Sequence, residues 1–164
     1  MKEKENYIVL AIEHAKGGTL TDLMKKREQD GVPLSEIDCA LIMKGILEGL
    51  RHIHQNDYVH RDLKPSNIVI DNVNKLETMK VVDFGLAVKV SNAGLDENCG
   101  TVVYQAPETM FGDISYGKAV DIWAAGFIMY ELICNMHPLY IKGENKQAYK
   151  EKLRELKKLD FSKG

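Results

Sequence analysis

Two short polar clusters near the middle of the chain constrain its fold and chemistry more than any other feature. Residues 60–67 read H-R-D-L-K-P-S-N, and residues 83–85 read D-F-G. Short apolar, β-branched runs at 58–59 and 68–70 flank the first cluster, and a third run at 79–82 leads into the second. These runs predict short strands. Both polar clusters therefore lie in loops held at the ends of strands.

The spacing predicts that side chains from both clusters meet. Pro65 restricts the backbone in the middle of the first loop, so that Asp62, Lys64 and Asn67 can point into one site. Twenty-one residues separate Asp62 from Asp83, a length over which a β-hairpin can fold back on itself. Two carboxylates and an amide should therefore converge.

Phosphoryl transfer is the chemistry that needs this set of side chains. Oxygen ligands from Asn67 and Asp83 suit Mg²⁺, which keeps several waters and takes few protein ligands. Lys64 can neutralise charge that builds on a phosphoryl group. Asp62 can orient an attacking hydroxyl and accept its proton. As separate turn residues the two aspartates would be unremarkable, but the combination is specific.

At this point the chain resembles the eukaryotic protein kinases. Residues 60–67 resemble the catalytic loop of that family, and 83–85 match its metal-binding motif. Residues 106–108, A-P-E, match the end of the activation segment, and 121–126, D-I-W-A-A-G, resemble the start of the buried central helix. The likeness runs from about residue 7 to about residue 159.

The resemblance implies an α+β fold, the large lobe of a protein kinase, mainly α-helical with small β-hairpins and without the small lobe. Residues 1–18 would form the end of the small lobe and the hinge, and 19–164 an incomplete large lobe. The sequence has no G-x-G-x-x-G loop over the phosphates. We therefore expect the parent protein to be a kinase that uses ATP and Mg²⁺, and this segment by itself to be inactive.

The resemblance also assigns a nucleotide pocket. Ile12 stands at the gatekeeper position behind the adenine, and Glu13 and Ala15 lie where the hinge backbone would bond it. Val69 stands at the floor of the pocket, and Thr19 is also expected to contact the nucleotide. His60 and Phe84 resemble members of the stacked regulatory spine. Asp121 is expected to hold the backbone of the catalytic loop from below.

Two residues indicate the serine/threonine class by their likeness to the family. Lys64 follows the catalytic Asp by two positions, and Thr101 stands where a threonine hydroxyl ties the substrate platform to Asp62 and Lys64. The substrate would then be a protein with a serine or threonine acceptor. Val103 argues against proline-directed specificity, where Arg is usual. Glu131 matches one of the acidic positions that the family uses to recognise basic substrates, but Thr19 and Ser66 stand at two others, so the support for such substrates is weak.

Arg61 raises a question of regulation. In kinases with Arg before the catalytic Asp, this Arg usually meets a phosphorylated residue of the activation loop. Here Glu97 lies close to the usual phosphosite, which suggests that an acidic residue partly substitutes for phosphate. A solvated acidic turn is an equally good interpretation, because one carboxylate carries less charge than a phosphate. Glu108 also lacks the buried arginine that usually pairs with it, which is costly if the site is buried.

Four helices are expected from apolar periodicity and capping residues. The second contains Gly45 and Gly49, which should let another element approach closely. The third is apolar on nearly all sides, which is typical of the centre of a domain. The helices are expected from Thr19 or Thr21 to about 26, from Ser35 to 54–57, over 120–134 and over 146–159.

Composition narrows the partners. A formal net charge of −2 gives no global attraction to nucleic acid or anionic lipid, and no apolar run is long enough to span a bilayer. Three scattered cysteines predict reduced thiols and a cytoplasmic or nuclear protein.

The lysine-rich last helix is either a docking face for a partner or a solvated surface. His52 and His54 are interpreted as helix-end residues. Beside the active kinase, a pseudokinase scaffold and a binding fragment remain alternatives.

Overall fold

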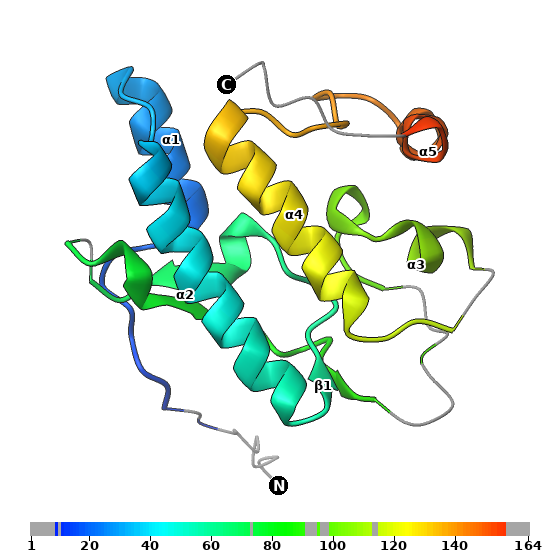
Figure 1. The fold of residues 1–164 in the computed structure, drawn as a ribbon, viewed down its shortest axis with the longest axis horizontal. Helices are drawn as coiled ribbons and strands as arrows, with labels where there is room; N and C mark the ends of the chain where they lie inside the picture. Colours follow the sequence, from blue (N-terminus) through cyan, green and yellow to red (C-terminus); the bar gives the residue numbers. More distant parts are fainter. Residues whose placement is uncertain are drawn as a thin grey trace, which may run out of the picture.

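The computed structural model describes residues 9, 11–72, 74–90, 95, 99–112 and 115–156. Within them, α-helices and short strands alternate with single 3₁₀ turns (Figure 1). In chain order these elements are α1 (Leu20–Asp30), α2 (Glu36–Gln55), β1 (Tyr58–Val59), η1 (Pro65–Asn67), β2 (Ile68–Ile70), η2 (Leu76–Thr78), β3 (Met79–Val81), β4 (Val88–Lys89), η3 (Val102–Tyr104), α3 (Pro107–Phe111), α4 (Ala119–Cys134) and α5 (Lys146–Glu155).

Capping boxes fix where the first two helices begin. The Thr19 side chain accepts a hydrogen bond from the Asp22 N–H, and the Asp22 carboxylate accepts one from the Thr19 N–H. Ser35 starts α2 through the same exchange with Asp38. The predicted starts are confirmed. The predicted end of the first helix near residue 26 is wrong, because α1 continues through good helix formers to Asp30 and stops at Gly31, whose φ is 64°.

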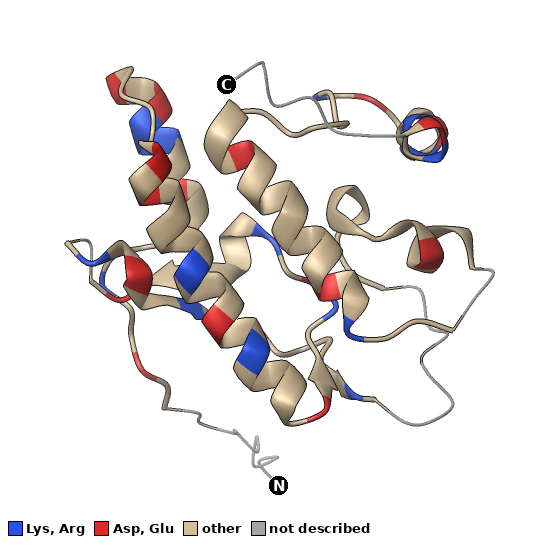
Figure 2. Ribbon diagram, in the orientation of Figure 1, with Lys and Arg blue, Asp and Glu red and all other residues tan. Residues whose placement is uncertain are grey.

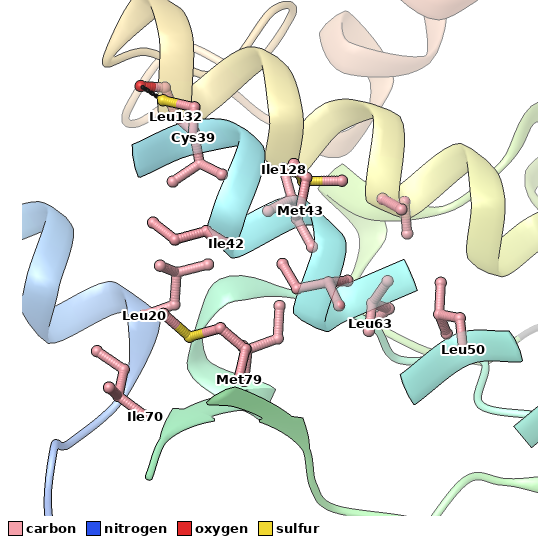
Figure 3. Packing of buried hydrophobic residues seen from close by; sticks show 14 of the residues in the cluster. Leu20, Cys39, Ile42, Met43, Leu50, Leu63, Ile70, Met79, Ile128 and Leu132 are labelled. Carbon is pink, nitrogen blue, oxygen red and sulfur yellow. Dashed lines mark hydrogen bonds between the residues drawn. The ribbon is translucent and has the colours of Figure 1, made fainter. Parts of the chain in front are cut away.

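The core lies between α2 and α4, which run side by side across the molecule (Figure 1). Figure 2 shows α4 almost free of charge, since its only acidic residues are Asp121 and Glu131, and both are buried. The prediction of a central apolar helix at 120–134 is confirmed. Figure 3 shows the packing, in which the Cys39 thiol also donates to the Leu132 carbonyl at 3.5 Å. The labelled core residues are Leu20, Cys39, Ile42, Met43, Leu50, Leu63, Ile70, Met79, Ile128 and Leu132.

The β2–β3 hairpin carries the two polar clusters back toward each other. The strands are antiparallel, with Ile68 opposite Val81 and Ile70 opposite Met79, as the spacing from Asp62 to Asp83 predicts. The hairpin packs on α2 at Gly45, where an added Cβ would lie 2.6 Å from the Glu77 carbonyl oxygen. Since real Cβ contacts are never so short, the close approach predicted at this glycine is confirmed.

Strand β1 pairs with β4, with Val59 opposite Val88. Strand β4 could not be predicted from the sequence, because two residues are too few for a periodic pattern. The predicted last helix is shorter than expected, since α5 ends at Glu155, and its side chains Tyr149 and Leu153 are buried as predicted. Residues 157–159 of that prediction lie outside the described residues.

Some predictions fall wholly or partly outside the described residues. The apolar, β-branched run at 7–12 favours a buried strand, but of its residues only 9, 11 and 12 are described, and these three are exposed and lie in no strand. Among the described helices, none is both long and apolar enough to cross a bilayer. The three cysteines, Cys39, Cys99 and Cys134, are free thiols.

Candidate active site

Asp121 anchors the loop that contains the first polar cluster. One carboxylate oxygen accepts the His60 N–H at 2.9 Å, and the other accepts the Arg61 N–H at 2.9 Å. Asp121 is 1% exposed, so both hydrogen bonds are shielded from water. The prediction that Asp121 holds the loop backbone is confirmed. Because Asp121 belongs to α4, the loop is fixed to the most buried helix of the fold.

Asp62 lies at the centre of a tight hydrogen-bond network. Its Oδ2 accepts from the Lys64 ammonium at 2.7 Å and from the Asn67 amide at 3.1 Å. Its Oδ1 accepts from the Thr101 N–H at 2.8 Å and the Thr101 hydroxyl at 2.7 Å. The ammonium of Lys64 also reaches the Thr101 hydroxyl at 2.8 Å. The structure therefore brings together all four predicted catalytic residues.

This network keeps the Asp62 carboxylate ionised. Partial burial by itself would raise the pKa of Asp62, but the hydrogen bonds from Lys64 and Thr101 outweigh it and hold the pKa below its ordinary value. The carboxylate side chain is 11% exposed. Asp62 is therefore a charged acceptor at neutral pH, held in one orientation by its donors and still reachable at the surface.

Gly100 lets the chain after the second cluster approach the catalytic loop. Its φ is 92°, and an added Cβ would lie 2.3 Å from the Arg61 carbonyl oxygen. A side chain at this position is excluded by both the backbone conformation and the contact. Glycine here is what allows the next residue, Thr101, to place its N–H and hydroxyl on Asp62.

Asn67 and Asp83, the predicted metal ligands, lie at the ends of adjacent strands. The Val82 N–H donates to the Asn67 carbonyl at 2.9 Å, which places Asp83 one residue beyond that contact. The Asn67 amide nitrogen also donates to the Asp62 carbonyl at 2.9 Å, so its side-chain oxygen is the atom left to face a cation. Asp83 has φ of 66°, and its side chain is exposed.

This pair fits Mg²⁺ better than a metal held by protein ligands throughout. Among the described residues, no group of three or more His, Cys, Asp or Glu side chains could hold a metal ion. Mg²⁺ commonly takes one or two protein oxygens and completes its shell with waters and phosphate. One amide oxygen and one exposed carboxylate are consistent with that habit.

The predicted nucleotide residues lie along one open edge. Ile12 is 79% exposed, and the Glu13 carboxylate pairs with the Lys80 ammonium at 2.7 Å. Ala15 is half-buried, and Thr19 forms an isolated β-bridge with Val69. The backbone groups of residues 11–16 pair with no other described residue. They can therefore pair with a ligand, whereas the Thr19 hydroxyl is bonded to Asp22 at 2.6 Å.

Two further predictions concern the contact of His60 with Phe84 and the partner of Arg61. His60 and Phe84 meet edge to face with ring centroids 5.3 Å apart, which confirms their contact. Arg61 bonds to the Leu86 carbonyl at 2.7 Å and to the Tyr116 hydroxyl at 3.2 Å. The hypothesis that Glu97 orders the activation loop through Arg61 concerns a residue outside the described part of the chain.

His54 is a residue of the site that sequence reasoning missed. Its Nε2 lies 2.8 Å from Asp121 Oδ2, the oxygen that accepts the His60 N–H. The interpretation of His54 as a simple helix-end residue is therefore incomplete, although that of His52, which is exposed, agrees with the structure. No local pattern could reveal this contact, because the two partners are 67 residues apart.

Glu131 is buried and bound to Tyr104, whose hydroxyl donates to both carboxylate oxygens at 2.9 Å. Burial raises the pKa of Glu131 to about 7, and the smaller effect of the Tyr104 hydrogen bond opposes it. Near neutral pH the Glu131 carboxyl group is therefore only partly ionised, and both of its oxygens accept from Tyr104. Such a group is a poor acidic anchor for a substrate. Glu108 is only half-buried, and no described cation pairs with it.

Comparison with known proteins agrees with this geometry. A model of the protein kinase domain matches residues 1–162. The chain is 34% identical over 153 residues to the probable serine/threonine-protein kinase 2 of Plasmodium falciparum, covering 93% of this chain and 29% of that protein. It is 39% identical over 137 residues to human serine/threonine-protein kinase DCLK3, covering 83% of this chain and 20% of that protein.

The fold is also similar to that of a solved kinase. A chain from the crystal structure of the yeast RNA Pol II CTD kinase CTDK-1 complex superposes with a TM-score of 0.73 and 33% identity, over 85% of this chain and 43% of that chain. The present chain spans less than half the length of each of these proteins. Because the protein kinase domain matches residues 1–162 of this chain, the chain belongs to the eukaryotic-type protein kinase family, and it has the large-lobe fold of that family.

Proposed function

We propose that the protein containing this chain is a serine/threonine kinase, which transfers the γ-phosphate of ATP to the hydroxyl of a protein serine or threonine. The observation that carries the proposal is the network around Asp62. An ionised carboxylate, an ammonium and a hydroxyl lie within 2.8 Å of one another on a loop fixed by α4. Few functions other than group transfer need this arrangement at a surface.

Each of these side chains has a distinct part in the proposed reaction. Asp62 accepts a hydrogen bond from the substrate hydroxyl, orients it and takes its proton as the bond to phosphorus forms. Lys64, which lies 2.7 Å from Asp62, neutralises charge on the phosphoryl oxygens. Thr101 keeps both groups in place through its hydroxyl, which donates to Asp62 and accepts from Lys64.

The nucleotide and the metal are part of the proposal as well. Asn67 and Asp83 would hold Mg²⁺, which when bound neutralises the charge of the phosphates. The backbone of residues 11–16, together with Thr19 and Val69, which form a β-bridge, would hold the adenine. The Glu13 side chain is engaged with Lys80, so the hinge would contact adenine through its main chain.

The serine/threonine class rests on Lys64 and Thr101 and agrees with the names of the two relatives, both of which are called serine/threonine-protein kinases. Specificity for a proline after the acceptor residue is not expected, because Val103 stands where proline-directed kinases usually have Arg. A preference for basic substrates gains little from Glu131, which is buried against Tyr104. The lysine-rich surface of α5 is proposed as a docking face, and the cytoplasm or nucleus as the location.

A pseudokinase scaffold or a binding module is the second candidate. Such a protein would use the same lobe only as a protein-binding surface. A segment that lacks the small lobe would be inactive as an enzyme and could act only by binding. The retention of Asp62, Lys64, Asn67 and Asp83 favours the active kinase, because a scaffold needs none of these four.

Phosphate transfer from ATP with Mg²⁺ to a generic serine/threonine protein substrate tests the proposal. The assay uses the longest natural product that contains this segment. We expect transfer that Asp62→Asn reduces by about a hundredfold or more. Asp30→Asn, an exposed aspartate at the end of α1, is the control and should keep full activity. Absence of transfer in a protein that includes a small lobe would favour the scaffold.

A further inference from the structure

The carbonyl of Val103 is held from two directions. His137 Nε2 donates to it at 2.9 Å, and the Tyr149 hydroxyl donates to it at 2.7 Å. Val103 is the middle residue of the η3 turn, whereas His137 lies in the loop after α4 and Tyr149 lies on α5. Two segments far along the chain thus converge on one backbone oxygen.

This turn is continuous with the catalytic network. It begins directly after Thr101 and is closed by the Tyr104 N–H, which donates to the Thr101 carbonyl at 2.9 Å. Thr101 in turn donates its own N–H to Asp62 at 2.8 Å. A displacement of Val103 therefore has a short, hydrogen-bonded path to the carboxylate of Asp62.

The hydrogen-bond partners of His137 assign its tautomer. Its Nδ1 accepts the N–H groups of Leu139 at 3.1 Å and Tyr140 at 2.8 Å, so this nitrogen carries no proton. The proton is then on Nε2, which points at Val103. Burial lowers the pKa of His137 to about 4, so this neutral form is kept at physiological pH.

The surroundings keep the ring in place. The rings of Tyr104, Phe127 and Tyr149 contact the imidazole with centroids 5.1–6.1 Å apart. Glu144 is the charged group that faces it from the loop before α5, and it is paired with Lys152. Glu131 lies beyond Tyr104 and bonds to that hydroxyl. A ring packed on several sides cannot rotate to release Val103 without disrupting this cluster.

We propose that His137 and Tyr149 are positioning residues that clamp the Val103 carbonyl and thereby hold the η3 turn and Thr101 in register for the protein substrate. The proposal rests on the proposed function, because it takes the turn to be part of the substrate platform. It also links α5 to the site, since Tyr149 is fully buried on that helix. A partner that moves α5 would act on the platform through the same carbonyl.

Two substitutions separate the two hydrogen-bonding roles of the histidine. His137→Asn keeps an acceptor near the Nδ1 position and loses the donor to Val103. His137→Gln places an amide nitrogen near the Nε2 position and loses the acceptor. Tyr149→Phe removes only the second donor and keeps the ring packing. The clamp predicts that Tyr149→Phe and His137→Asn impair substrate binding, whereas His137→Gln retains more of it.

Steady-state kinetics on the longest natural product gives the first readout. Losing one hydrogen bond to Val103 should raise the KM for the protein substrate about fivefold, with the KM for ATP unchanged. The variant carrying both His137→Asn and Tyr149→Phe should lose more than the product of the single effects, because the carbonyl then has no donor. Lower kcat with both KM values unchanged would mean a smaller folded fraction and would overturn the proposal.

Amide hydrogen exchange gives a second readout that needs no catalysis. Exchange at the Thr101 and Tyr104 amides should become about tenfold faster in His137→Asn and Tyr149→Phe, because the clamped turn holds these two N–H groups on their acceptors, the Asp62 carboxylate and the Thr101 carbonyl. The Ile70 amide, bonded to Gly18 at 2.9 Å, is the control and should not change. Equal acceleration at all three amides, or none, would overturn the clamp. Local acceleration in a protein without kinase activity would support the clamp while the proposed function fails.

Discussion

The imidazole of His54 on α2 lies 2.8 Å from the carboxylate of Asp121 on α4, and the same carboxylate oxygen accepts the backbone N–H of His60. A residue of the second helix is thereby joined to the catalytic loop through a buried group of the central helix. The contact ties the two longest helices to the loop that carries Asp62.

The His54 contact should be measurable as stability. His54→Ala leaves a buried carboxylate short of a partner, so we expect it to lower the free energy of unfolding by about 1–3 kcal/mol. His52→Ala removes an exposed histidine from the same helix and should change it by less than about 0.5 kcal/mol. Urea denaturation monitored by circular dichroism compares the two. Equal effects of both substitutions would show that His54 has no special role.

The close packing of the β2–β3 hairpin on α2 makes Gly45 irreplaceable. Helix propensity predicts that Gly→Ala stabilises a helix by up to about 1 kcal/mol. At Gly45 the new methyl group would lie 2.6 Å from the Glu77 carbonyl oxygen. We therefore expect Gly45→Ala to destabilise the protein by about 1–3 kcal/mol, as judged by its thermal melting temperature.

Gly126 on α4 is the matched control for this test. An added Cβ there meets no atom within 4 Å. Gly126→Ala should therefore follow propensity and raise the stability by about 0.5–1 kcal/mol. At Gly49 the neighbour is a Val81 methyl at 3.2 Å, which can yield, so Gly49→Ala should fall between the two. A stabilising Gly45→Ala would contradict the packing.

Glu131 predicts a stability difference that depends on pH. Its folded pKa is raised from 4.5 to about 7 because of burial. Below about pH 4.5 the group is protonated in both the folded and the unfolded state and costs no stability. Between about pH 4.5 and pH 7 only the unfolded state releases the proton, so the destabilisation grows over this range and is constant above it. Glu131→Gln keeps an acceptor for the Tyr104 hydroxyl without that charge. The variant should become progressively more stable than the parent between about pH 4.5 and pH 7 and keep a constant advantage above that range.

Unfolding free energies of both proteins across that pH range test this prediction. Glu48→Gln, at an exposed position of α2, is the control and should give a difference that does not vary with pH in this way. A difference that stays constant with pH for Glu131→Gln would mean that burial does not raise the pKa of Glu131 in the folded state.

For phosphoryl transfer, the hydroxyl group of Thr101 should matter more than the size and shape of its side chain. It donates to Asp62 at 2.7 Å and accepts from Lys64 at 2.8 Å. Thr101→Ser keeps both contacts, and we expect it to retain most of the activity. Thr101→Val keeps the shape without the hydroxyl and should lower kcat about tenfold to a hundredfold. Similar rates for the two variants would contradict the proposed role.

Much of the fold follows from the sequence because its signals are local. Thr19 and Ser35 cap their helices through residues three positions later, and the apolar character of 120–134 requires burial wherever that helix lies. The β2–β3 hairpin is likewise short in sequence. The end of α1 was harder to predict, since propensity carried the helix on to Asp30 until Gly31 stopped it.

The sequence by itself predicted the residues of the candidate site, because Asp62, Lys64 and Asn67 are close along the chain and Asp83 follows across one hairpin. Only the tertiary structure decided how they are held. The contacts of His54 with Asp121 and of His137 and Tyr149 with Val103 span 34 to 67 residues. No periodic pattern encodes such pairs, since they depend on how α2, α4 and α5 pack, and burial then gives Glu131 and His137 their shifted pKa values.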